Sequence, residues 1–169
     1  MLQHPIPPVY NKESRLLILG SFPSVKSREQ GFFYGHPQNR FWRVLAAVFE
    51  QPLPMTVPER REFLLRNRVA LWDVIAACNP SGSSDASIRE AEINDLSPIL
   101  STAPIRGIFV NGQTAAKFYR RWTQPRTGRP AISLPSTSPA NAAWSLERLT
   151  QVWKRELDPY LTSEDELDE

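Results

Sequence analysis

Three consecutive hydroxyl residues could bind an anion. Ser136, Thr137 and Ser138 follow a short apolar run. Hydroxyls and the free amides at a helix N-terminus are good partners for phosphate oxygens, which makes this segment a candidate phosphate-binding loop. Ser138 stands before Pro139, a pair that is also typical of a helix start in which the serine is the cap. A serine nucleophile is disfavoured, because the sequence contains no Gly-x-Ser-x-Gly elbow.

Two histidines and two residues at the ends of apolar runs could also take part in a reaction. His36 lies in an aromatic loop and has the residue type of a general acid or base, but we prefer a histidine that orders the loop. His4 has no supporting context. Asp73 could accept an N–H from a ligand or from the backbone of the next loop, and both interpretations stay open. Asn111 could line a pocket, although Asn111-Gly112 is also common turn chemistry.

The composition excludes several classes of site. A single cysteine, Cys78, cannot build a disulfide framework, a cysteine-based metal site or an iron–sulfur cluster, so we expect no metal and no cofactor. The net charge is +2, but five of the 18 acids lie in residues 163–169, which leaves 13 acids against 20 Lys and Arg in the body. A body of +7 fits a polyanionic partner or a solvated surface. No apolar run approaches the roughly 20 residues of a membrane span and no signal-peptide pattern is visible, so we expect a cytoplasmic protein.

Apolar runs and amphipathic segments alternate along the chain and must position these residues. Buried strands are expected over residues 15–21, 69–74, 105–111 and 131–134. Helices are expected over residues 40–50, 56–68 and 138–157, and from residue 112 onward. This alternation predicts an α/β fold, a three-layer α/β/α sandwich with a central, mainly parallel four-stranded sheet. Ligands of such folds bind at the carboxyl ends of the strands, so the loops of interest span residues 21–38, 75–85, 111–113 and 135–138.

Local signals mark several boundaries. Thr56 and Glu59 form a predicted capping box, and Ser87 with Glu90 predicts the start of a short helix. In the helix that begins at residue 112, four side chains are expected to face inward: Ala115, Phe118, Tyr119 and Trp122. The composition divides the chain into a Pro-rich N-terminal arm over residues 1–14, a single domain over residues 15–160 and an acidic C-terminal tail over residues 161–169.

Two segments resemble the signature motifs of the uracil-DNA glycosylase superfamily. The first comprises residues 20–24 (GSFPS) and residues 31–42 (GFFYGHPQNRFW), and the second comprises residues 134–141 (LPSTSPAN). The His-Pro-x-Asn-Arg-Phe-Trp stretch is similar to the mismatch-specific uracil and thymine glycosylases. The whole pattern is most similar to the hypoxanthine-DNA glycosylases, over about residues 16–157. The resemblance implies a monofunctional DNA glycosylase that flips a deaminated base, above all hypoxanthine, out of double-stranded DNA and hydrolyses its glycosidic bond in base excision repair. It further implies a monomer, associated with the nucleoid, that needs no metal, cofactor or membrane.

The resemblance also implies roles for individual residues. In the mismatch-specific enzymes an asparagine positions water at the place that Phe22 occupies here, whereas in the hypoxanthine branch the catalytic asparagine matches Asn39. Asn39 is therefore the expected catalytic residue, and it is also a plausible helix cap by residue type. Tyr34 matches the aromatic residue that stacks on the flipped base, and the Asp73 carboxylate suits the N1–H of hypoxanthine. The expected substrate-binding residues are Gly20, Ser21, Phe22, Pro23, Tyr34, Asp73 and Asn111, and the expected DNA-binding residues are Ser24, Ser136, Thr137 and Ser138.

Three alternatives remain beside this prediction. A mismatch-specific uracil or thymine glycosylase would share the fold and the loops but have another pocket. A lesion-binding protein without catalysis is the second alternative, because Phe22 stands where a catalytic asparagine is found in relatives. An unrelated nucleotide-binding α/β protein is disfavoured, because the sequence has no Gly-x-Gly-x-x-Gly and no phosphate-loop lysine motif.

Overall fold

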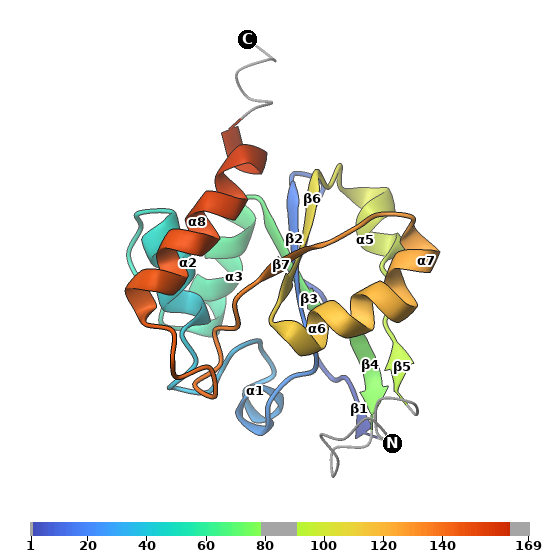
Figure 1. Ribbon diagram of the computed structural model, residues 1–169, viewed down its shortest axis with the longest axis horizontal. Helices are drawn as coiled ribbons and strands as arrows, with labels where there is room; N and C mark the ends of the chain where they lie inside the picture. Colours follow the sequence, from blue (N-terminus) through green and yellow to red (C-terminus); the bar gives the residue numbers. More distant parts are fainter. Residues whose placement is uncertain (1, 79–90, 163–169) are drawn as a thin grey trace.

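The computed structural model describes residues 2–78 and 91–162 and has a four-stranded sheet at its centre (Figure 1). The strands of this sheet, in the spatial order β3-β2-β6-β7, are β2 (Leu16–Gly20), β3 (Val69–Asp73), β6 (Gly107–Asn111) and β7 (Ile132–Leu134). Every pairing within it is parallel. All residues of β2 are buried, as expected for a central strand that is covered on both faces. The sheet prediction is confirmed, with strand ends displaced by one or two residues.

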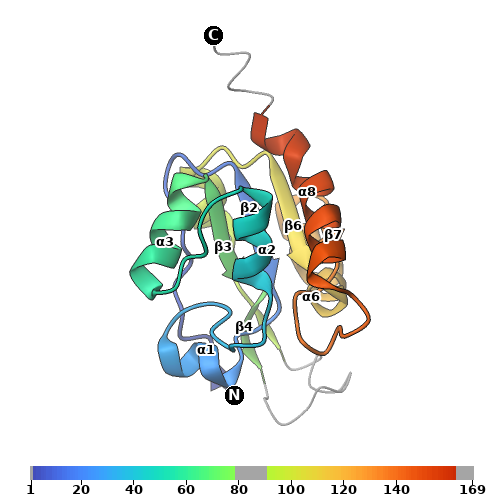
Figure 2. The same cartoon turned by 90° about the vertical axis from the view of Figure 1, so that its left-hand side faces the viewer.

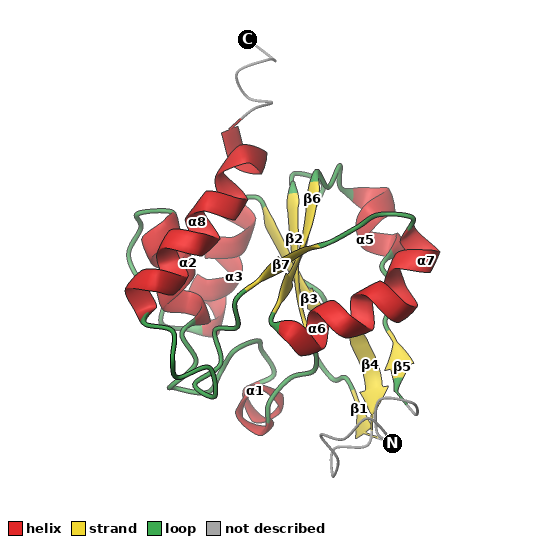
Figure 3. Ribbon diagram, in the orientation of Figure 1, coloured by secondary structure: helices red, strands yellow, loops and turns green. Residues whose placement is uncertain are grey.

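Helices cover both faces of the sheet (Figures 1 and 3). One face carries α2 (Phe41–Val48), α3 (Val57–Arg66) and α8 (Leu146–Thr162). The other carries α5 (Ser97–Thr102), α6 (Gln113–Phe118) and α7 (Gln124–Thr127), with a π-helical turn, η1 (Tyr119–Thr123), between the last two. Figure 2 looks onto the layer of α2, α3 and α8, which lies in front of the sheet. Each layer of helices packs on its own apolar cluster, so the predicted three-layer α/β/α sandwich is confirmed.

A second, antiparallel sheet was not predicted. It has the order β1-β4-β5 and consists of β1 (Leu2–Gln3), β4 (Ile75–Cys78) and β5 (Glu92–Ile93). The prediction of a loop from residue 75 is wrong for β4, whose alternation of buried and half-buried residues is too short to stand out in the sequence. The remainder of that loop and the helix expected at Ser87 lie outside the described residues.

The loop after β2 contains a short helix that was also not predicted from the sequence. α1 (Val25–Gln30) begins at Ser24, whose hydroxyl accepts the N–H of Ser27, and ends at Gly31 in the left-handed conformation with φ of 70°. The capping box before α3 is present, because Thr56 Oγ1 accepts the N–H of Glu59 at 3.2 Å. Local side-chain caps therefore define the starts of both helices.

Two predictions about later helices are wrong. α8 begins at Leu146 instead of Ser138, and Ser145 is the residue whose hydroxyl accepts an N–H of the first turn, that of Arg148. Trp122 does not face inward but is 38% exposed. It lies in the π-helical turn, whose i→i+5 hydrogen bonds place more residues in each turn and so shift the side chains away from the positions that an α-helical period predicts.

The Pro-rich N-terminal segment packs on the body of the protein. Ile6 and Val9 are buried in the core, and Val9 pairs with Leu71 of β3 in an isolated antiparallel bridge. The indole N–H of Trp72 donates to the carbonyl of Ile6 at 3.0 Å. These contacts hold residues 6–9 beside β3. Among the described residues, no helix is long and apolar enough to cross a membrane.

Candidate functional site

A cavity of about 330 Å³ lies where the parallel strands end. Its walls come from the loops after β2, β6 and β7 and from the segment that precedes α2. Every residue that the sequence assigned to the site lines it: Gly20, Ser21, Phe22, Pro23, Ser24, Tyr34, Asn39, Asp73, Asn111, Ser136, Thr137 and Ser138. The tertiary structure thus brings both sequence motifs to one cavity, as expected from the ends of parallel strands.

One wall is a chain of hydrogen bonds between polar side chains. The hydroxyl of Thr137 donates to Asn39 Oδ1 at 2.9 Å, and the same hydroxyl accepts from Asn111 Nδ2 at 3.0 Å. Asn111 Oδ1 accepts the backbone N–H of Thr137 at 3.1 Å, and Asn111 Nδ2 also approaches the phenol oxygen of Tyr34 at 3.1 Å. Thr137 is fully buried, so this network fixes the side chains around it.

The Asn39 amide has a defined orientation. Its Oδ1 accepts the backbone N–H of Phe41 at 2.9 Å, and a backbone N–H can only donate. With Thr137 as the second donor, both lone pairs of Oδ1 are engaged. The Nδ2 amino group has no hydrogen-bond partner among residues 2–78 and 91–162, and Asn39 lines the cavity. The N-cap residue of α2 is Arg40, so Asn39 lies one position earlier than a cap, but its oxygen still accepts the first N–H of the helix. Asn39 can therefore hold the helix start and offer an N–H donor at the same time.

Tyr34 is held face-on against Phe41. The ring centroids lie 4.0 Å apart with an interplanar angle of 15°, and Tyr34 adopts a positive φ of 52° that non-glycine residues rarely take. One face of the ring is therefore covered, and only the other could meet a ligand. Burial raises the pKa of the Tyr34 phenol well above its usual range, and the nearby Asp73 carboxylate adds to the rise. Tyr34 is consequently a neutral hydroxyl at physiological pH.

The Asp73 side chain has a partner that was not predicted from the sequence. His4 Nε2 lies 2.8 Å from Asp73 Oδ2, and the two side chains are 3% and 5% exposed. No local pattern predicts this pair, because the two residues are 69 positions apart in the chain. The alternative role for Asp73, bonding the backbone amides of the next loop, has no support among the described hydrogen bonds.

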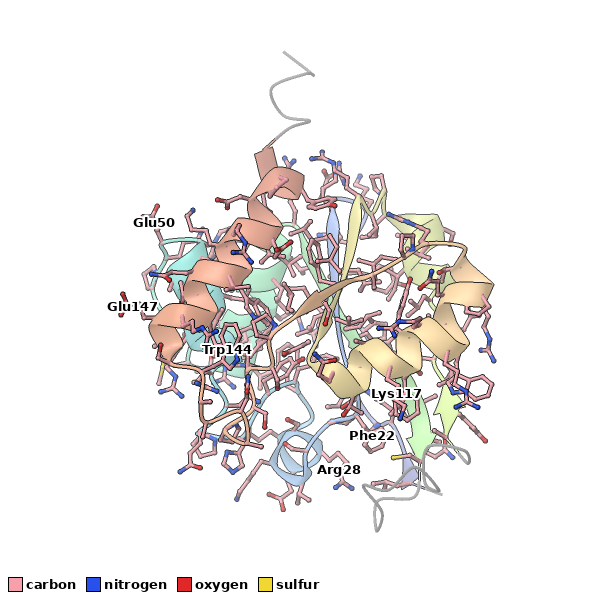
Figure 4. The ribbon with its side chains drawn as sticks, viewed as in Figure 1. Phe22, Arg28, Glu50, Lys117, Trp144 and Glu147 are labelled. Atoms are coloured by element: carbon pink, nitrogen blue, oxygen red, sulfur yellow. The ribbon has the colours of Figure 1, made fainter. Side chains whose placement is uncertain are left out.

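Figure 4 shows Phe22 beyond the ends of the parallel strands, and its ring makes a T-shaped contact with His4, with the ring centroids 5.7 Å apart.

Two glycines allow close approach of the walls. A Cβ on Gly20 would lie 2.7 Å from the Tyr34 hydroxyl and even closer to Asp73 Oδ1. Gly112 has φ of 96°, and a Cβ there would lie 3.1 Å from the Ser136 side chain. Both positions therefore exclude larger residues for a steric reason, and Gly112 also meets the turn chemistry expected of an Asn-Gly pair.

Arg40 anchors the loop between β7 and α8. Its guanidinium donates to the carbonyls of Ser138 at 3.0 Å and Asn141 at 3.1 Å, and also to that of Trp144, which lies shortly before α8 (Figure 4). Its backbone N–H donates to the Thr137 carbonyl at 3.1 Å. These bonds hold residues 137–144 in an irregular conformation, which explains why no helix begins at Ser138.

The hydroxyls of this loop face two adjoining hollows. Ser136 Oγ accepts the N–H of Ser138, and Ser138 Oγ accepts the N–H of Ala140, both at 3.1 Å, so each hydroxyl keeps its own hydrogen for another acceptor. A second cavity of about 550 Å³ shares Ser136 and Ser138 with the first and extends to Trp144. A chain that enters the first cavity could therefore continue along this loop.

His36 fits the ordering role that the sequence favoured. Its Nδ1 accepts the N–H of Gln38 at 3.1 Å within its own loop, although the residue also borders the cavity. Among the described residues no three His, Cys, Asp or Glu side chains come together as metal ligands would. The site thus offers three kinds of interaction. Asn39 and the hydroxyls of Ser136 and Ser138 can donate hydrogen bonds, Asp73 can accept one, and the free face of the Tyr34 ring can stack.

Comparison with known proteins finds matches that span most of the chain. The family model described as the Uracil DNA glycosylase superfamily matches residues 7–158. A hypoxanthine DNA glycosylase of Methanosarcina acetivorans is 35% identical over 153 residues, which cover 88% of this chain and 94% of that protein. One of Methanosarcina barkeri is 35% identical over 120 residues, 70% of this chain and 76% of that protein.

A solved structure also matches. The solution NMR structure of a candidate uracil DNA glycosylase from Methanosarcina acetivorans superposes with a TM-score of 0.77 at 34% identity. The superposition covers 92% of this chain and 96% of the other. The match to the family model includes every residue that lines the first cavity.

Proposed function

The chain belongs to the uracil DNA glycosylase superfamily, and on that premise we propose that it removes hypoxanthine from DNA by hydrolysis of the N-glycosidic bond. Two relatives of the chain are hypoxanthine DNA glycosylases. The observation that carries the proposal is that one cavity holds both the Asn39 amide and the Asp73 carboxylate. The first supplies a donor for water, and the second supplies an acceptor for the ring N–H of a deaminated purine.

The reaction needs water and a leaving base. The C1′–N9 bond breaks, its electron pair leaves with the base, the water oxygen bonds to C1′, and one water proton ends on the base. The sugar passes through an oxocarbenium-like transition state, as in other glycoside cleavage. Asn39 Nδ2 would donate to the water oxygen and leave a lone pair of that oxygen for C1′. Its position is fixed in advance by Thr137 and Phe41, so little reorganisation is needed in the transition state.

The flipped base would be recognised by stacking and by one acceptor. The free face of Tyr34 would stack on the base, because Phe41 covers the other face. Asp73 would accept the N1–H of hypoxanthine. Uracil also has a ring N–H, so Asp73 alone does not reject it, and we propose that an incompletely filled purine slot does. Hypoxanthine can be protonated on its imidazole ring, which makes it a good leaving group for a site whose first sequence motif supplies no carboxylate general base.

DNA would be held by the loop that Arg40 anchors. Ser136 and Ser138 have hydroxyl hydrogens available for phosphate oxygens, whereas the Ser24 hydroxyl donates to Ser27 Oγ at 3.1 Å and would have to turn. Double-stranded DNA is the partner that we propose. An enzyme with this substrate would be associated with the nucleoid. The duplex phosphates would also help to stabilise the cationic sugar.

A panel of matched duplexes tests the proposal. Each carries deoxyinosine, deoxyuridine, deoxyxanthosine or a normal base at the same position, and cleavage is measured under single-turnover conditions. We expect release of hypoxanthine to be fastest. Faster release of uracil would replace the proposal by the mismatch-specific uracil glycosylase, and tight binding without release of any base would favour a lesion-binding protein.

A further inference from the structure

The N-terminal segment carries a side chain into the wall of the active site. The backbone N–H of His4 donates to the carbonyl of Ala76 at 2.7 Å, next to the pairing of β1 with β4. This contact directs the imidazole to the end of β3, where Nε2 meets Asp73 Oδ2 at 2.8 Å. His4 does not itself line the cavity, whereas Asp73 does.

The hydrogen bonds of His4 define which nitrogen carries the hydrogen. The backbone N–H of Ile6 donates to His4 Nδ1 at 3.2 Å, so Nδ1 presents a lone pair and the ring hydrogen is on Nε2. The Nε2–H therefore donates to Asp73 Oδ2. This bond occupies one carboxylate oxygen and leaves the other, Oδ1, for a different donor.

Three aromatic rings hold the imidazole in place. Phe22, Phe33 and Trp72 lie with their ring centroids 5.7, 6.2 and 6.1 Å from that of His4. Phe22 thus has a use that the sequence did not suggest, because its ring makes a T-shaped contact with the imidazole. The enclosure excludes water from the Nε2–H, so Asp73 is the partner that remains for this donor.

We propose that His4 is a positioning residue, which holds Asp73 Oδ2 so that Oδ1 is turned toward the ring N–H of the flipped base. The position of Oδ1 is consistent with this role, because it lies directly over Gly20, beside the Tyr34 hydroxyl and at the edge of the cavity. The inference rests on the proposed function in one respect, namely that Asp73 meets the base. The N-terminal segment, residues 2–6, would then contribute to the choice of base through His4.

The test compares two bases that differ at the atoms Asp73 would read. Deoxyinosine has the N1–H, and deoxynebularine, a purine without N1–H and O6, lacks it. His4→Phe keeps a ring but removes the donor, and we expect it to slow single-turnover cleavage of deoxyinosine about 10-fold or more, the scale of one charge-assisted hydrogen bond. Cleavage of deoxynebularine should change less than about 3-fold. His4→Gln, whose amide can donate from a similar place, should restore most of the rate on deoxyinosine.

A double-mutant cycle and a matched control separate positioning from folding. After Asp73→Asn, the further change His4→Phe should have little effect on deoxyinosine, because the two residues act through one bond. Val9→Ala lies in the same segment and leaves the donor intact, so it should lower thermal stability without changing the ratio of the two substrates. Equal loss on both substrates, additive effects in the cycle, or no loss in His4→Phe would overturn the inference.

Failure of the proposed function would be visible separately. If the wild-type protein does not release hypoxanthine, the proposed function is wrong, but the hydrogen bond between His4 and Asp73 is not thereby contradicted. Nitrogen-15 NMR of the His4 ring then decides the geometry, since we expect the Nε2–H form in the wild type and a shifted Nε2–H resonance in Asp73→Asn. An Nδ1–H form in the wild type would overturn the assigned role of His4.

Discussion

The hydroxyl of Thr137 donates a 2.9 Å hydrogen bond to the side-chain oxygen of Asn39, which lies 98 positions earlier in the chain. The bond joins the loop after β7 to the segment before α2, and so joins the two sequence motifs. Arg40 reinforces the same junction through its backbone N–H and its guanidinium. Movement of residues 136–138 on a DNA backbone would therefore be transmitted to the amide that we propose as the water donor.

Replacement of Asn39 by alanine should separate chemistry from stability. We expect Asn39→Ala to lower the single-turnover rate about 100-fold or more, the scale of one preorganised polar group. The free energy of unfolding should fall by only about 1 kcal/mol, the usual loss for a helix cap. Asn67→Ala is the matched control, because the Asn67 amide also bonds both the backbone and a side chain, here the Phe63 carbonyl and Gln51, but at the end of α3. A near-wild-type rate for Asn39→Ala would reduce Asn39 to a cap.

A methyl group at Gly20 should displace both side chains that we propose to read the base. Asp73 is held by His4 and Tyr34 is stacked on Phe41, so neither can move away cheaply. We expect Gly20→Ala to slow base release about 10- to 100-fold, as small misplacements at reaction centres do. Gly107→Ala is the control: its Cβ would lie 2.9 Å from Phe109 and Tyr160 at the opposite end of the sheet. It should reduce stability and leave the rate of the folded enzyme unchanged.

Loss of the Arg40 guanidinium should free the loop between β7 and α8. Arg40→Met removes bonds to three carbonyls, and we expect about 10-fold weaker binding to lesion duplexes because the loop must then be ordered on binding. Arg66→Met, on α3, also removes one positive charge and serves as the control for charge alone. Equal weakening by both variants, measured by fluorescence anisotropy, would contradict a specific role of the loop.

Binding to a lesion duplex should depend on salt. Neutralised phosphates release counterions, so we expect the logarithm of Kd to rise linearly with the logarithm of salt concentration, by at least about 10-fold between roughly 50 and 200 mM. Ser136→Ala should weaken binding without altering the slope, because a neutral hydroxyl releases no counterion. Binding that is independent of salt would argue against contact with the phosphate backbone.

Ionisation of the Tyr34 phenol should destabilise the folded protein at alkaline pH. Its pKa is raised in the folded protein by burial and by the Asp73 carboxylate, so the unfolded chain loses the phenol proton first. Stability is therefore fully present below the usual tyrosine pKa of about 10 and declines above it by up to about 1.4 kcal/mol per pH unit. Urea unfolding of the wild type and Tyr34→Phe from neutral to alkaline pH measures the difference. Parallel curves above pH 10 would show that Tyr34 ionises freely.

Much of the framework follows from the sequence alone. Residues 16–20 and 107–110 are continuous apolar runs, and such runs bury themselves as parallel strands when helices separate them. Thr56 caps its helix because a cap is a contact between near neighbours. The carboxyl ends of parallel strands share one edge, so the loops that form the cavity could also be named in advance.

Only the tertiary structure decided the contacts that join distant segments. The start of α8 moved from Ser138 to Ser145 because Arg40, far away in sequence, holds the carbonyls of the intervening loop. His4 had no local signal, and its role emerged only when β1 and β4 brought it to Asp73. Periodicity and capping describe interactions within a few residues, whereas the orientation of Asp73 and Asn39 depends on hydrogen bonds across 69 and 98 positions, which chain folding alone brings within reach.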